Sequence, residues 1–153
     1  MKRCLTLLCL LLAFAAQGAA LQPLTLASLP QLQARFAGER HAILFWSLSC
    51  VPCHAELAEL GKTKDVTQLP ISLVNTDDPD QADAVMVFLT ERHLEKMDNW
   101  QFADAIPERL RDAIDADWYG ELPRTYVVDA NGKRTGHSGK TDLMQLLGWL
   151  RQH

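Results

Sequence analysis

FWSLSCVPCHAEL, residues 45–57, joins an apolar run to a helical pattern and decides how the chain folds. The run His41–Ser47 is mostly apolar and of strand length, which predicts a strand covered on both faces. A helix is expected to follow from about Cys50 to Gly61. The buried side of this helix should be formed by Ala55, Leu57, Ala58 and Leu60. The two cysteines therefore stand where a buried strand passes into a helix.

This position gives the two cysteines different chemistry. The first helical turn carries unpaired N–H groups and the positive end of the helix dipole, and both favour a thiolate over a thiol. Cys50 is therefore expected to be the attacking nucleophile, because the thiolate is the reactive form. Cys53 lies one turn further in, where it can attack the mixed disulfide and release the product. Pro52 stiffens the turn without costing a helix hydrogen bond.

A Cys-x-x-Cys pair also occurs in zinc sites, haem attachment sites and structural bridges. Zinc is disfavoured because the mature chain has no second cysteine pair and no clustered histidines. A structural bridge closing so short a loop would constrain the unfolded chain little. Haem is the main alternative, because Cys50, Cys53 and His54 form the c-type attachment pattern. The buried strand that precedes the cysteines favours a redox pair.

Residues 1–20 have the features of a signal peptide. Two cationic residues precede the apolar run 5–16, and Gly18 and Ala20 are suitably placed for signal peptidase. An uncleaved anchor is the alternative, but the run is shorter than the roughly 20 residues that span a bilayer. We therefore expect one domain, residues 21–153, exported to the periplasm or another extracytoplasmic space.

Removal of this leader changes the cysteine content and the charge. Cys4 and Cys9 leave with it, so Cys50 and Cys53 are the cysteines of the mature chain, and a multi-bridge scaffold is excluded. Two basic residues are also lost, which takes the net charge from −4 to −6. A nucleic-acid partner is not expected, since such a surface needs clustered positive charge.

The rest of the chain alternates helical and strand-like patterns. Asn131-Gly132 lies between the last two strand-like runs, which predicts a hairpin. Strands that alternate with helices before a terminal hairpin indicate an α/β fold in which helices flank a mixed sheet. The expected elements are a helix from Ser28 to before Gly38, strand Pro70–Val74, helix Asp80–Lys96, short strand Trp100–Ala103, helix Pro107–Trp118, strands Thr125–Asp129 and Lys133–His137, and helix Thr141–Gln152.

Two segments together resemble a known family. Residues 45–57 look like the active-site segment of thioredoxin-fold proteins, and the Phe-Trp pair and Glu56 are similar to the exported TlpA/ResA-like branch. GELPRTYVVDANGK, residues 120–133, resembles that family's second hallmark, a cis-proline followed by a strand and a hairpin. The resemblance runs from His41 to the end of the chain. It implies a thioredoxin-like mixed sheet with an extra helix and strand between the Cys-x-x-Cys helix and the cis-proline strand.

The resemblance also implies roles for individual residues. Cys50 and Cys53 would be the catalytic pair, joined by a disulfide in the oxidised form. Pro123 would be the cis-proline facing Cys50, and Leu122 would offer its backbone N–H and C=O to an extended substrate peptide. Trp46 would contribute to substrate binding. An ordinary trans proline that begins an edge strand is the alternative for Pro123.

The chain departs from the pattern of cytoplasmic thioredoxins in ways that bear on proton transfer. Leu44 occupies the place of their buried acid, and Ser49 replaces the usual aromatic residue. Glu56 is a candidate substitute for the acid, although a carboxylate on a helix is commonly a solvated surface charge. Arg124 adds positive charge that could tune Cys50, with an exposed arginine as the alternative.

These features predict a thiol–disulfide oxidoreductase that needs no organic cofactor and no metal. The dipeptide Val51-Pro52 and the apolar Leu122 resemble reducing members, which favours reduction of disulfides in exported proteins, including apocytochromes c. A membrane thiol–disulfide relay would supply the electrons. The alternatives are an oxidase or isomerase of the same fold, a c-type haem electron carrier and a thiol-dependent metal chaperone.

Overall fold

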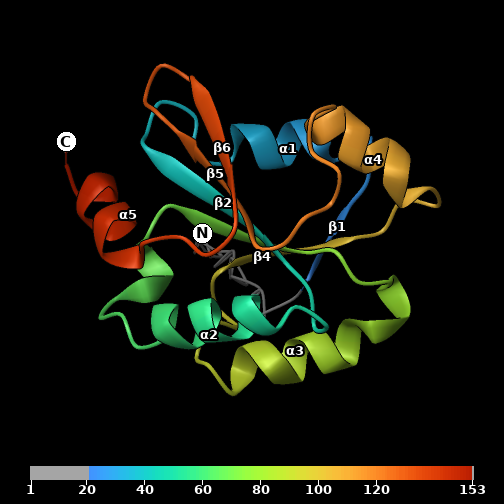
Figure 1. The fold of residues 1–153 in the computed structure, drawn as a ribbon, viewed down its shortest axis with the longest axis horizontal. Helices are drawn as coiled ribbons and strands as arrows, with labels where there is room; N and C mark the ends of the chain where they lie inside the picture. Colours follow the sequence, from blue (N-terminus) through green and yellow to red (C-terminus); the bar gives the residue numbers. More distant parts are fainter. Residues whose placement is uncertain (1–20, 153) are drawn as a thin grey trace, which may run out of the picture.

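The computed structural model describes residues 21–152, which form a mixed sheet with helices on both faces (Figure 1). The strands are β1 Gln22–Leu24, β2 His41–Trp46, β3 Ile71–Asn75, β4 Asp98–Phe102, β5 Arg124–Val128 and β6 Arg134–Ser138. The helices are α1 Leu29–Ala34, α2 Val51–Leu60, α3 Ala82–Thr90, α4 Pro107–Ile114 and α5 Leu143–Leu150, with short 3₁₀ turns at Val66–Gln68 and Pro79–Gln81.

The strand order is β1-β4-β3-β2-β5-β6, so β2 lies inside the sheet. Strands β1 to β4 pair in parallel, whereas β5 is antiparallel to β2 and β6 is antiparallel to β5. All six residues of β2 are buried, as its apolar sequence predicts. The register places Phe45 of β2 opposite Arg124 of β5. The start of β5 therefore lies beside the end of β2, from which the chain runs to the cysteines.

Two hydrophobic clusters lie on opposite faces of the sheet. Residues Leu44 and Trp46 of β2 belong to the cluster formed with α2, α3 and α5, whereas Ile43 and Phe45 belong to the cluster with α1 and α4. This division follows from the alternation of side chains along a strand. Figure 1 shows α1 and α4 on one side of the sheet and α2 and α3 on the other. The first cluster contains Cys53, so we call its side the cysteine face.

The architecture is the predicted one, with differences at the ends of elements. Strand β1 was not predicted because it is three residues long, but it pairs with β4. Helix α3 ends at Thr90 rather than Lys96, because His93 takes a left-handed backbone conformation, φ 59°. Helix α4 ends at Ile114, and Asp115 is extended, which leaves Trp118 free to pack on Phe45.

The predicted signal peptide, residues 1–20, lies outside the described residues. Within residues 21–152, no helix has the length and apolar character that a membrane crossing requires.

Candidate active site

The cysteine pair sits at the start of α2, immediately after the loop that follows β2. Cys50 is the N-cap residue of the helix, and its Sγ accepts a hydrogen bond of 3.2 Å from the amide of Cys53. The two residues form a disulfide. Cys50 is half-buried, whereas Cys53 is 1% exposed. An incoming molecule therefore meets Cys50 first, and Cys53 is shielded behind it.

The loop before the cysteines is held by Asp77, which follows the neighbouring strand β3. The hydroxyl of Ser47 donates to Oδ1 of Asp77 at 2.6 Å, and the amide of Leu48 donates to Oδ2 at 2.7 Å. The side-chain amide of Asn75 donates to the same Oδ2 at 2.8 Å. Hydrogen bonds to a carboxylate are stronger than neutral ones, so Asp77 fixes the path of the chain into Cys50. The sequence pattern alone did not reveal this role of Asp77, because its partner Ser47 is 30 residues away in the sequence.

His54 closes the same loop from the helix side. Its Nε2 lies 2.8 Å from the carbonyl oxygen of Leu48, and because a carbonyl only accepts, Nε2 carries the proton. The ring also packs on Phe88, with centroids 4.7 Å apart. His54 is thus a structural residue of the loop. Ligation of haem iron through Nε2 would break this hydrogen bond.

Pro123, from the C-terminal part of the chain, lines the same small cavity as Cys53. The Leu122–Pro123 peptide bond is cis, and Pro123 is buried immediately before β5. A cavity of about 10 Å³, the size of one water molecule, is lined by Cys53, Glu56 and Pro123 together with Leu44, Phe45, Trp46 and Leu57. The pairing of β5 with β2 therefore brings together two motifs that are far apart in the sequence.

Glu56 is buried rather than solvated, and it lies on the buried side of α2 where Ala55 was predicted, whereas Ala55 is exposed. The side chain of Glu56 is on the cysteine face of α2, three residues after Cys53, and the residue is 2% exposed. Oε2 accepts a hydrogen bond of 3.4 Å from the amide of Thr141, and Oε1 has no partner within the described part of the chain. Burial raises the pKa of Glu56, and hydrogen bonding by Thr141 and the charge of Lys140 partly offset this rise.

Arg124 lies on the face of the sheet away from the cysteines. Its guanidinium forms an ion pair of 2.8 Å with Asp115 and stacks over the ring of Tyr126, 4.7 Å from the centroid. The hydroxyl of Tyr126 donates to Asp115 at 2.7 Å, and this bond lowers the pKa of Asp115. The charge of Arg124 is therefore compensated by Asp115, and the side chain is neither exposed nor directed at Cys50.

Comparison with known proteins rests on structure, because no protein-family model and no curated relative matches the chain. A thioredoxin-family thiol:disulfide interchange protein from Chlorobium tepidum TLS superposes with a TM-score of 0.58 at 18% identity, covering 77% of this chain and 83% of that one. The fold is thioredoxin-like. A secreted Mycobacterium tuberculosis disulfide oxidoreductase homologous to E. coli DsbE gives a TM-score of 0.54 at 18% identity, covering 76% and 84%.

Within this thioredoxin-like fold, the other two predicted site residues lie at different depths. Leu122 is half-buried beside Pro123, at the surface of the site. Trp46 is 2% exposed and stacks on Phe88, with centroids 4.8 Å apart. Its ring supports the site from within the core and offers no surface to a substrate. The sequence pattern also gave no sign of Thr141, whose contact with Glu56 spans 85 residues.

Proposed function

We propose that the protein is an exported thiol–disulfide oxidoreductase that reduces disulfides of extracytoplasmic proteins through Cys50 and Cys53. The observation that carries the proposal is the pairing of a half-buried Cys50 at a helix N-cap with a shielded Cys53 next to the buried Glu56. A purely structural bridge would need no such carboxylate, whose burial is unfavourable.

The reaction begins with the reduced protein. The Cys50 thiolate attacks one sulfur of a substrate disulfide, forms a mixed disulfide and releases the other substrate sulfur as a thiolate. Cys53 then loses its proton and attacks Sγ of Cys50, which forms the Cys50–Cys53 disulfide and releases the second substrate thiolate. The substrate gains two electrons and the cysteine pair loses two, while the released thiolates take protons from water.

Glu56 is the group placed to take the proton from Cys53. Both residues line the same cavity of about 10 Å³, a volume that one water molecule fills. A carboxylate with a raised pKa accepts a thiol proton at neutral pH more readily than a solvated one. The path needs no buried acid on β2, where Leu44 stands.

Substrate binding is assigned to the backbone at Leu122, in front of Pro123. An extended peptide would pair there as a short strand, with its disulfide next to Cys50. The half-buried Leu122 is the residue available for this contact.

The proposal also covers the direction of the redox reaction and the partners of the protein. Val51-Pro52 between the cysteines and the apolar Leu122 favour a reductant of the TlpA/ResA type over an oxidase or isomerase. Export through residues 1–20 would place the protein in the periplasm, with a membrane thiol–disulfide relay as electron donor. Its substrates would be exported proteins with disulfides, including apocytochromes c.

The test is reduction of a fluorescent peptide disulfide by the purified, reduced protein. We predict that Cys50→Ser abolishes activity, because the attacking sulfur is lost. Cys53→Ser should instead accumulate the mixed disulfide between Cys50 and the peptide, which mass spectrometry detects. Equal activity of Cys50→Ser and wild type would refute the proposal. A Soret band on the purified holoprotein would favour the haem alternative.

A further inference from the structure

The carboxylate of Glu56 is contacted by the segment between β6 and α5. The amide of Thr141 donates to Oε2 of Glu56, and the hydroxyl of Thr141 lies close enough to lower the pKa of this group as well. Thr141 precedes Asp142, which caps α5 by accepting a hydrogen bond of 3.0 Å from the amide of Gln145. The segment is thereby anchored to the helix, so Thr141 holds a defined position against Glu56.

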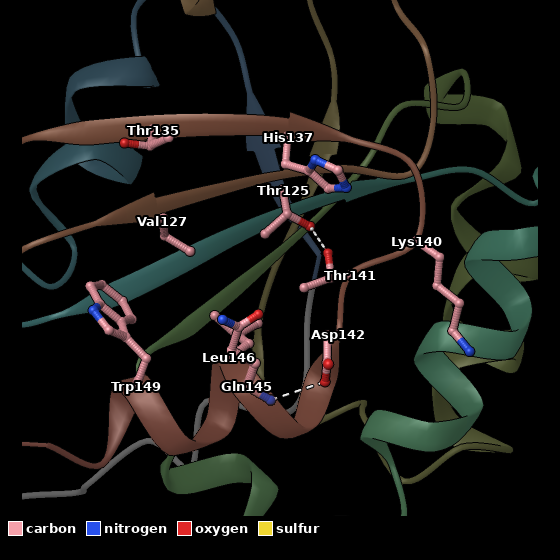
Figure 2. A pocket seen from close by; sticks show the side chains of 10 residues that line it. All are labelled: Thr125, Val127, Thr135, His137, Lys140, Thr141, Asp142, Gln145, Leu146 and Trp149. Carbon is pink, nitrogen blue, oxygen red and sulfur yellow. Dashed lines mark hydrogen bonds between the residues drawn. The ribbon is translucent and has the colours of Figure 1, made fainter.

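Thr141 also faces solvent. Its hydroxyl is 2.8 Å from that of Thr125 on β5, and both residues line a cavity of about 490 Å³ between the β5–β6 hairpin and α5 (Figure 2). Figure 2 shows the two hydroxyls pointing toward each other at one end of this cavity. Thr141 is half-buried, whereas Thr125 is buried. Thr141 thus lies between the buried carboxylate and a cavity open to water.

We propose that Thr141 is a positioning residue for disulfide exchange. It holds Glu56 ready to take the proton of Cys53, and it links this carboxylate to solvent in the cavity between the β5–β6 hairpin and α5. This inference rests on the proposed function and adds a route for the proton. The route runs from Cys53 to Glu56, which line one small cavity, and leaves past Thr141, whose amide contacts the carboxylate. The proton therefore exits into the cavity between the β5–β6 hairpin and α5.

The charged groups around Glu56 are consistent with a proton exit past Thr141. Lys140 lies next to Thr141 and favours the ionised carboxylate, while Glu59 opposes it from the next turn of α2. Asp142 and His137 line the neighbouring cavities. On the side of β2 and Pro123, the cavity shared with Cys53 is lined by apolar side chains. Within the described residues, polar surroundings for the proton thus lie on the Thr141 side.

The experiment compares Thr141→Val with wild type in single-turnover reduction of the peptide disulfide across a range of pH. Valine keeps the amide and the shape but removes the hydroxyl. Because that hydroxyl lowers the pKa of Glu56, its loss should move the inflection of the rate profile to higher pH. Below the inflection, the rate of Thr141→Val should therefore be lower than that of wild type. Thr141→Ser should restore the wild-type profile.

Two controls separate this role from a structural one. Thr135→Val makes the same change at an exposed residue of the same cavity and should leave the profile unchanged. In a Glu56→Gln background, Thr141→Val should have no further effect, because the residue acts through the carboxylate. An unshifted profile for Thr141→Val in an active protein would overturn the inference. An inactive wild type would instead overturn the proposed function.

Discussion

Glu56 is the residue for which burial matters most. Its side chain is almost fully buried, and Oε1 has no hydrogen-bond partner among residues 21–152, so ionisation there is costly. This unfavourable burial occurs on the face of α2 that also carries Cys53. We interpret this as a carboxylate kept for proton transfer rather than for stability.

The raised pKa of Glu56 predicts how stability depends on pH. The folded state holds this proton more tightly than the unfolded state, so the stabilisation is complete below the ordinary value of 4.5 and is lost as pH rises through the folded pKa. Wild type should therefore lose stability relative to Glu56→Gln from acidic to neutral pH, by about 1.4 kcal/mol for each unit of the rise in pKa.

Urea unfolding at a series of pH values measures this difference. Glu108→Gln, at an exposed position of helix α4, is the matched control. A stability difference between wild type and Glu56→Gln that stays constant with pH would contradict the burial of an ionisable group.

Individual residues differ in how far the sequence reveals them. Cys50, Cys53 and Pro123 stand in motifs whose spacing is visible in the chain itself. Asp77 and Thr141 carry no such signal, because their partners are 30 and 85 residues away in the sequence. The burial of Glu56 was only one of two interpretations, since helical spacing alone does not say what covers a face.

Among the elements, the junction of α4 with β5 is stabilised by Asp115, Arg124 and Tyr126. Burial raises the pKa of Tyr126 to about 12, and its hydroxyl donates to the carboxylate of Asp115. The end of α4 at Ile114, four residues earlier than predicted, allows Asp115 to turn toward β5. Helical periodicity continued through this point, so the sequence could not reveal the break.

Asp115→Asn tests this network. The pKa of Asp115 is lowered by the Tyr126 hydroxyl, so its stabilisation is present above the ordinary value of 3.8 and is lost as pH falls through the folded value. We predict a loss of about 1 kcal/mol at neutral pH that disappears in acid. The exposed Asp112→Asn is the control, measured by thermal unfolding at several pH values.

The same variant should leave the rate of disulfide exchange unchanged, because the network lies on the face opposite Cys53. A change in this rate with Asp115→Asn would show instead that Arg124 influences the cysteines.

At the scale of the whole molecule, one strand pairing assembles the site. Because β5 runs antiparallel beside β2, the residue before β5 arrives at the end of β2 from which α2 begins. The mixed sheet flanked by helices could be predicted from the order of elements, since apolar runs and turn residues mark most of them. The edge strand β1 could not, because three residues with a single buried side chain give no periodicity.

A redox titration of the Cys50–Cys53 pair against glutathione, read by mass spectrometry of the alkylated protein, tests the central claim most directly. A reductant should show a reversible two-electron transition near or below about −250 mV. A midpoint near about −120 mV would identify an oxidant and contradict the proposed direction. A pair that does not exchange with glutathione at all would contradict the account as a whole.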